Sequence, residues 1–204
     1  MKRVQSKDIP GFTFPIPDVT GWPKKGVLLE LGTLLGHSAV IWAETFEAND
    51  MDWRIVTIDS CGNMEPPETV EGLSEGQLRA MQNYMRARGL VVSGKEKEKQ
   101  IKNNLKGWPN ITFRKEQIKF DDKFTFNLEP ALTAVYYDML HTYEANKWAL
   151  ERFKHLDYIY IDDYGPHFPG TIQAVDEHVE LYNKHLEIVV TDHGNSGQAR
   201  ITKR

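Results

Sequence analysis

Three aspartates in the second half of the chain are the side chains whose type and spacing best suit chemistry. Asp138 ends an apolar segment that begins at Leu132, and Asp162 and Asp163 close a second segment that begins at Tyr158. If these segments are neighbouring parallel strands, the three carboxylates meet at one edge of the sheet. Hard oxygen ligands of this kind suit Mg²⁺, which keeps waters and leaves positions open for substrate oxygens. Capping or turn carboxylates are the plainer interpretation of the same residues.

A glycine-containing turn after the first apolar run is a second candidate site. Glu30 ends this run, Gly32 and Gly36 bracket the turn, and Ser38 begins the helix-like segment that follows. Glycine lets a ligand approach the backbone closely, and free N–H groups at a helix start favour polar or anionic ligand groups. Glu30 could hold an ammonium group. The three close glycines of a dinucleotide-binding loop are absent.

Asp59 ends the second apolar run, at the position where an acid can accept hydrogen bonds from both ribose hydroxyls of a nucleotide. A strand-end aspartate without such a role is also common. Together with the turn around Gly32, however, Asp59 predicts a nucleotide site at the ends of the first two strands.

Alternating strand-like and helix-like segments must position these residues. Apolar runs that read as strands occupy residues 27–31, 54–59, 111–113, 132–138, 158–162 and 187–192, with helix-like segments between most of them. This alternation predicts an α/β fold with a doubly wound, mostly parallel sheet covered on both faces.

The length of 204 residues predicts a single domain with two irregular features. Residues 1–25, here called the leader, contain several prolines and should pack over the domain. Residues 60–108, here called the insertion, contain helical signals, including the capping-box spacing of Ser74 and Gln77 and an apolar stripe through Met81 and Met85. The insertion could form a substrate lid, a dimer contact or plain core packing, so the oligomeric state stays open.

Composition excludes several classes of function. A formal net charge of −4 gives no general attraction to nucleic acid or to an anionic membrane. Cys61 is the only cysteine, which excludes an internal disulfide and fits a reducing compartment. The sequence has neither a segment of signal-peptide kind nor a run of about 20 apolar residues. We therefore expect a cytoplasmic protein whose partner is a small molecule.

The acid followed by G-x-x-x-G resembles the first motif of the class I S-adenosylmethionine methyltransferases. The later block DDYG…AVDE sharpens the resemblance to the metal-dependent sugar O-methyltransferases that act on macrolide and aminocoumarin antibiotics. Matching residues span 28–59 and 135–179, roughly half of the chain. The resemblance implies a seven-stranded sheet and Mg²⁺ on Asp138, Asp162 and Asp163. It also implies that S-adenosylmethionine contacts Glu30, Gly32, Gly36, Ser38 and Asp59, with Gln117 standing where the family usually has an acid near the adenine.

The general base is where the sequence departs from that family. Its members end the fourth strand with Asp-Gly-Asp, and the second acid is the base; here Leu140 occupies that position and cannot accept a proton. His141 could replace it if its ring faces the metal, although a helix-start histidine could also point elsewhere. His37 and His167 are further candidates. The resemblance thus implies Mg²⁺-dependent O-methylation of a hydroxylated small molecule or sugar. The alternative is a protein that binds the cofactor and has lost transfer.

Overall fold

The computed structural model describes residues 3–10, 14–66, 68, 74–120, 132–190 and 197–203. Its strands form one mixed sheet in the order β3-β2-β1-β4-β5-β7-β6. The strands are β1 (Lys25–Leu31), β2 (Asp52–Asp59), β3 (Ile111–Lys115), β4 (Ala134–Tyr137), β5 (Tyr158–Tyr164), β6 (His185–Val190) and β7 (Gly197–Thr202). The first five run parallel, and β7 runs antiparallel to both β5 and β6.

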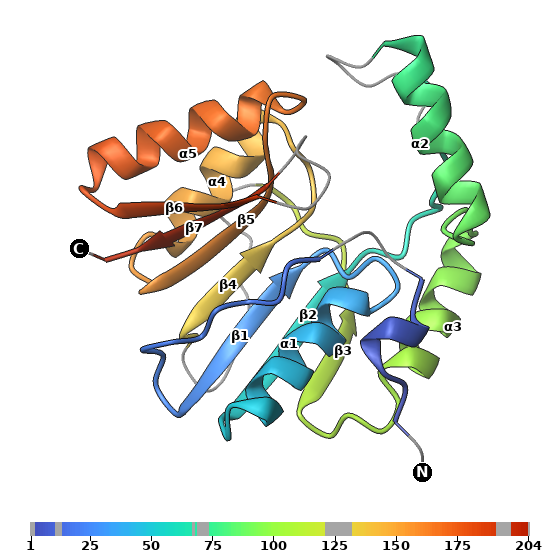
Figure 1. Cartoon of the computed structure of the whole chain (residues 1–204), viewed down its shortest axis with the longest axis horizontal. Coiled ribbons are helices and arrows are strands. Elements are labelled where there is room, and N and C mark those ends of the chain that lie inside the picture. The colour runs from blue at the N-terminus through green and yellow to red at the C-terminus, as the bar shows by residue number, and fades with distance from the viewer. Residues whose placement is uncertain are drawn as a thin grey trace.

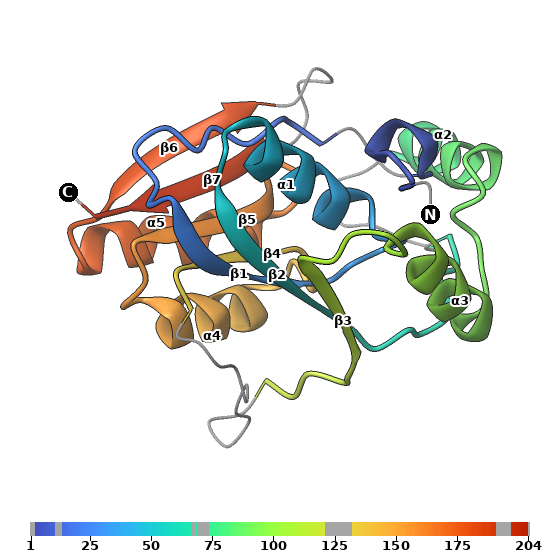
Figure 2. The ribbon, with the colours of Figure 1, turned by 90° about the horizontal axis from the view of Figure 1, so that it is seen from below.

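Helices cover both faces of this sheet. They are α1 (His37–Ala48), α2 (Glu75–Ala87), α3 (Gly94–Asn104), α4 (Tyr143–Phe153) and α5 (Pro169–Leu181), preceded by a short 3-10 helix, η1 (Ser6–Asp8). Helix α1 lies on one face, whereas α4 and α5 lie on the other (Figures 1 and 2). Helices α2 and α3 stand beside the β3 end of the sheet, and α2 extends away from the body (Figure 1).

Stacked aromatic rings build the core on the α1 face. Trp22 of the leader lies 4.9 Å from Trp53 of β2, and Trp42 of α1 lies 5.6 Å from Phe46, measured between ring centroids. Rings of this size remove much apolar surface from water and so contribute strongly to stability. The leader is therefore packed into the domain at Trp22.

On the opposite face, α4 and α5 pack against the centre of the sheet. Leu150 and Phe153 of α4 and Val175 of α5 are buried with Val135 of β4 and Ile159 of β5. Most of β1 and all of β4 are buried, as central parallel strands covered by helices must be.

The expected fold class is confirmed, and the differences lie at the ends of elements. β7 corresponds to no segment expected from the sequence. Its residues, GQARIT, include several polar side chains and show no apolar run, although most of them are buried. β5 continues to Tyr164, two residues beyond the expected end at Asp162, so both Asp162 and Asp163 lie within the strand. The strand expected at 187–192 spans His185–Val190, and residues 191 and 192 lie outside the described part.

Each helix signal of the insertion corresponds to a helix, but the two helices pack very differently. The capping box between Ser74 and Gln77 is formed at the start of α2. In α2 only Met85 is buried, whereas α3 contributes Ile101 to the core next to the following Leu105. No helix in the described residues is long and apolar enough to cross a membrane.

The turn between β1 and α1 depends on two glycines. Gly32 and Gly36 have φ angles of +92° and +88°, which favour glycine. A Cβ atom on Gly32 would lie 1.7 Å from the backbone oxygen of Asp138, so this turn and the end of β4 are in direct contact.

We expect Gly32→Ala to lower the free energy of unfolding by about 2 to 5 kcal/mol, because the added methyl group meets backbone and the φ angle is strained. Gly76→Ala in α2 is the matched control, since nothing lies within 4 Å of its added Cβ. That control should be neutral or gain up to about 1 kcal/mol. Denaturant titration measures both changes, and equal effects would contradict the tight contact at Gly32.

Candidate functional site

The ends of β4 and β5 bring the three predicted metal ligands together. β4 and β5 pair in parallel with Tyr137 opposite Ile161, so Asp138 and Asp162 follow at adjacent positions of neighbouring strands. The Asp138 N–H donates a hydrogen bond of 2.8 Å to the carbonyl of Leu31 on the other side, which fixes the backbone at this point.

An irregularity in β5 falls at Asp162 and Asp163. The pairing of β5 with β7 shifts between Ile161 and Tyr164, and Asp163 has a φ of +55°. Successive side chains of a regular strand point to opposite faces, whereas a bulge can re-aim one of them. The result is that Asp162 and Asp163 both act electrostatically on Asp138.

The carboxylates of this group disfavour one another's charged forms. Burial, followed by repulsion from Asp162 and Asp163, raises the pKa of Asp138 well above its usual range. Burial and repulsion from Asp163 likewise raise the pKa of Asp162. The Tyr136 hydroxyl donates to Asp138 Oδ2 across 3.5 Å, a long contact that compensates little.

Crowded carboxylate oxygens of this kind fit a hard divalent cation, which would replace mutual repulsion by attraction. As they stand, no group of three or more His, Cys, Asp or Glu side chains among the described residues is arranged to hold a metal ion. Binding would therefore require small side-chain rotations at the ends of β4 and β5.

His141 faces the same group of carboxylates. Its Nε2 lies 3.3 Å from Asp163 Oδ2, and its ring packs 4.6 Å from that of Phe168. Burial lowers the pKa of His141, with Asp162 acting in the opposite direction. Because Nε2 faces a carboxylate acceptor, the neutral ring carries its proton there and leaves Nδ1 as the acceptor. Nδ1 is buried and has no hydrogen-bond partner among the described residues.

Leu140 points outward, as its 50% exposure shows, while its backbone holds the segment in place. Its carbonyl accepts hydrogen bonds from the Tyr137 hydroxyl at 3.1 Å and from Asn146 Nδ2 at 3.3 Å. His141 is fixed in turn, because its carbonyl accepts from the Thr171 hydroxyl at 3.4 Å. Among the described residues, no contact brings His37 or His167 to these carboxylates. Burial lowers the pKa of His37.

Glu30 is fully buried beneath the glycine-containing turn. The Ser38 hydroxyl donates to Glu30 Oε1 at 2.6 Å, and the Thr57 hydroxyl donates to Oε2. Burial raises the pKa of Glu30 to about 7 despite these two hydrogen bonds. Ser38 and Glu30 are thus joined, and a buried acid stands behind the loop predicted to receive the cofactor.

Asp59 joins three segments of the chain at the end of β2. Its Oδ1 accepts from the N–H of Cys61 at 2.6 Å, and its Oδ2 accepts from the N–H of Thr33 at 3.1 Å. Lys97 of α3 donates to the same Oδ2 at 2.9 Å. The Lys97 and Asp59 side chains are only 12% and 7% exposed, so this is a buried ion pair. Sequence reasoning missed Lys97, because it is one of several lysines that alternate with glutamates in α3.

Gln117 lies just beyond β3, on the surface. The neighbouring Glu116 donates its N–H to the carbonyl of Asp59 at 3.0 Å, which places this segment beside the end of β2. Gln117 is therefore near the predicted nucleotide site, although its side chain has no recorded contact there.

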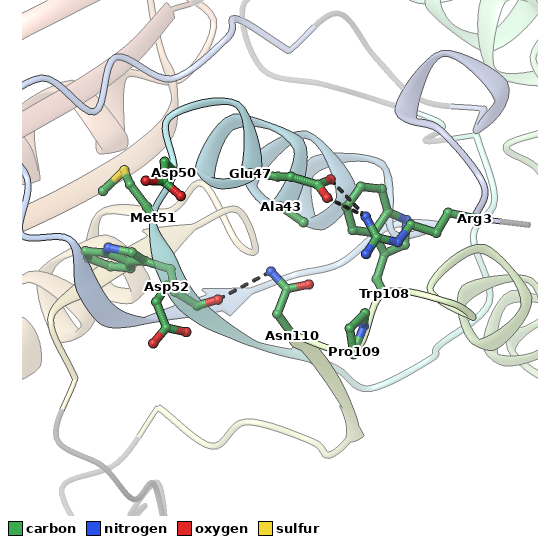
Figure 3. A pocket seen from close by; sticks show the side chains of 10 residues that line it. Arg3, Ala43, Glu47, Asp50, Met51, Asp52, Trp108, Pro109 and Asn110 are labelled. Atoms are coloured by element: carbon green, nitrogen blue, oxygen red, sulfur yellow. Dashed lines mark hydrogen bonds and ion pairs between the residues drawn. The ribbon is translucent and has the colours of Figure 1, made fainter.

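A surface pocket of about 250 Å³ lies at the opposite edge of the sheet. Figure 3 shows its lining, where Arg3 faces Glu47 beside Trp108. Arg3 Nη1 contacts both Glu47 carboxylate oxygens, at 2.8 and 2.9 Å. Asp52 and Asn110 place the pocket at the start of β2 and just before β3, so it is separate from the carboxylates described above.

No protein-family model matches the sequence, and no curated protein matches it either. The solved structure of the O-methyltransferase NovP is 22% identical, with a TM-score of 0.55 over 87% of this chain and 72% of that chain. The citrinin polyketide synthase CMeT domain is 10% identical, with a TM-score of 0.49 over 88% of this chain and 46% of that one. An Aquifex aeolicus SAM-dependent methyltransferase is 12% identical, with a TM-score of 0.46 and coverage of 88% and 82%. The likeness to NovP shows that the chain has the class I methyltransferase fold.

The burial of Glu30 makes a prediction about stability and pH. Its pKa is higher in the folded than in the unfolded chain, so folding favours the protonated acid and stability is lost as pH rises from about 4.5 to about 7. Glu30→Gln removes this charge. The difference in free energy of unfolding between this variant and the parent should therefore shift in the variant's favour by about 3 kcal/mol as pH rises across that interval. Chemical unfolding at pH 5 and pH 8 measures this difference.

The matched control for this test is Glu180→Gln, on the exposed side of α5. It tests whether replacing a carboxylate by an amide changes stability without burial. A stability difference at Glu30 that is the same at both pH values would contradict a raised pKa for this acid.

Proposed function

We propose that this protein is an S-adenosylmethionine-dependent methyltransferase that methylates a hydroxyl oxygen of a small molecule with the help of Mg²⁺. One observation carries this proposal: in a class I methyltransferase fold, Asp138 and Asp162 lie at the same sheet edge as the Gly32 turn. The contact between Gly32 and the backbone of Asp138 makes the two groups neighbours. A cofactor on the turn would therefore lie beside any acceptor bound at the carboxylates.

Two sets of residues would hold the two cofactors. The turn bounded by Gly32 and Gly36 would bind the methionine end, and the charge of Glu30 beneath it would favour an ammonium group. Asp59 would accept the ribose hydroxyls. Gln117 would lie near the adenine, and Asp138, Asp162 and Asp163 would hold Mg²⁺.

When bound, S-adenosylmethionine supplies an electrophilic methyl group and Mg²⁺ supplies a Lewis acid that lowers the pKa of a coordinated hydroxyl. The protein's own part is to orient the acceptor oxygen in line with that methyl group and to remove the hydroxyl proton. His141 would receive the proton at Nδ1 while Asp163 holds Nε2. Transfer would form an oxygen–carbon bond and break the methyl–sulfur bond, whose electron pair would remain on sulfur.

The proposed acceptor is a hydroxylated small molecule, such as a sugar. This choice rests on the resemblance to sugar O-methyltransferases and on the structural likeness to the O-methyltransferase NovP. We propose neither nucleic acid nor a membrane as a partner, because a protein with a net charge of −4 has no general electrostatic attraction to either. We propose a cytoplasmic location, in keeping with the single cysteine.

A second candidate function is cofactor binding without transfer. Two observations favour it: Leu140 stands where the related family has its base, and Lys97 pairs with the acid expected to bind ribose. The two functions differ in whether any acceptor is methylated.

The test of the proposed function is calorimetry with S-adenosylhomocysteine, followed by a transfer assay with S-adenosylmethionine over a panel of hydroxylated acceptors. We expect binding, transfer that needs Mg²⁺, and a melting temperature that rises when Mg²⁺ is added. Binding without transfer to any acceptor would favour the second function. Transfer that persists under chelation, or melting that ignores Mg²⁺, would remove the metal from the proposal.

The role of His141 makes a separate prediction. His141→Ala should lower the transfer rate by a factor of about 10² to 10⁴, the usual contribution of a positioned acid or base, while cofactor affinity stays unchanged. His155→Ala, at an exposed position after α4, is the control. Equal rates for the two variants would show that solvent or another group takes the proton.

A further inference from the structure

The ion pair between Lys97 and Asp59 uses the carboxylate that the proposed function assigns to the ribose of the cofactor. Both Asp59 oxygens already accept backbone N–H groups, and Oδ2 accepts the Lys97 ammonium group as well. A carboxylate oxygen has about two acceptor positions. Oδ1 keeps one free position, whereas Oδ2 is fully used. A pair of ribose hydroxyls that binds one to each oxygen therefore requires one of the two Oδ2 donors to leave.

Lys97 is the donor that can leave, because the other donor belongs to a tightly held turn. The Thr33 N–H is part of the backbone between Gly32 and Gly36, where Gly36 donates to the Thr33 carbonyl at 2.7 Å. Lys97 instead reaches Asp59 through a side chain with four rotatable carbon–carbon bonds. Rotation of that side chain frees Oδ2 without moving the sheet.

Helix α3 is held against both halves of the proposed cofactor site. At its start, a Cβ on Gly94 would lie 2.1 Å from the Cys61 carbonyl, so α3 touches the loop after β2 directly. At its end, Asn104 Nδ2 donates to the Leu35 carbonyl at 2.9 Å, within the turn after β1. Figure 2 shows α3 beside the β3 end of the sheet. Lys97 is thus presented to Asp59 by a helix anchored at both ends.

We propose that Lys97 sets the affinity of the cofactor site by occupying Asp59, so that the ribose of the cofactor must displace its ammonium group. This inference rests on the proposed function and adds to it a residue from the insertion. In the ligand-free protein the pair keeps a buried aspartate compensated, since an unpaired buried charge is costly. On binding, the ribose hydroxyls take over that compensation and Lys97 turns toward solvent.

The test compares the affinity for S-adenosylhomocysteine of the parent and of Lys97→Met by calorimetry. Removing the competing cation should tighten binding about tenfold, the scale set by one charge-assisted hydrogen bond. Lys99→Met is the matched control on the same helix; Lys99 is 70% exposed and lies 3.8 Å from Glu96, and its loss should leave affinity unchanged. Lys97→Gln, which keeps polarity without charge, replaces Lys97→Met if the latter does not fold, and should also bind more tightly.

A second measurement uses the unaltered protein. Acetylation of lysines by an amine-reactive reagent, read by mass spectrometry, should be slow at Lys97 without ligand and faster with S-adenosylhomocysteine, whereas Lys99 should not change. Equal or weaker binding by Lys97→Met, or Lys97 labelling that does not increase, would overturn the displacement while leaving the proposed function intact. If neither the parent nor the variants bind S-adenosylhomocysteine, the proposed function fails and this inference fails with it.

Discussion

Acidic side chains gathered at the carboxyl edge of a parallel sheet are the constraint on which this structure depends. Glu30, Asp59, Asp138, Asp162 and Asp163 all lie at or near the ends of β1, β2, β4 and β5. Burying a carboxylate costs free energy unless hydrogen bonds or a cation compensate it. Hydroxyl groups compensate Glu30, and Lys97 together with two backbone N–H groups compensates Asp59. Burial, followed by repulsion from Asp162 and Asp163, raises the pKa of Asp138, and burial with repulsion from Asp163 raises the pKa of Asp162.

This distribution explains why the fold tolerates acids that do not stabilise it. The pKa of Glu30, raised to about 7, means that folding works against its charge at neutral pH. A residue of this kind is understandable if ligand binding uses the charge, because perturbed acids concentrate at functional sites. The proposed roles of Glu30 and of the three aspartates follow the same logic: each group is destabilising when alone and compensated when a ligand is bound.

Much of this arrangement could be predicted from sequence because it depends on local pattern. Alternating apolar runs predicted the sheet, and the spacing of Gly32 and Gly36 predicted a turn that the φ angles of +92° and +88° now explain. The resemblance pointed to Asp138, Asp162 and Asp163 because they stand in short local motifs. β7 was not assigned, because its buried Gln198 and Arg200 hide the apolar alternation that marks a strand.

Other features could not be predicted, since they depend on contacts between distant segments. The irregularity of β5 between Ile161 and Tyr164 arises in its pairing with β7, an antiparallel neighbour that the sequence did not reveal. Lys97 meets Asp59 across 38 positions of the chain, and its neighbours in α3 carry the same charge pattern without the same partner. The orientation of His141 toward Asp163 depends on the hydrogen bonds that fix the carbonyls of Leu140 and His141, which no motif encodes.

The central claim is that the turn after β1, the end of β2 and the three aspartates form one continuous site. A crystal structure of the protein with S-adenosylhomocysteine and Mg²⁺ tests this claim most directly. We predict electron density for the ribose at Asp59, the sulfur atom near the Gly32 turn, and a metal ion between the side chains of Asp138 and Asp162. A nucleoside bound elsewhere, for instance in the pocket beside Trp53 and Trp108, or a sulfur atom directed away from the carboxylates would contradict it.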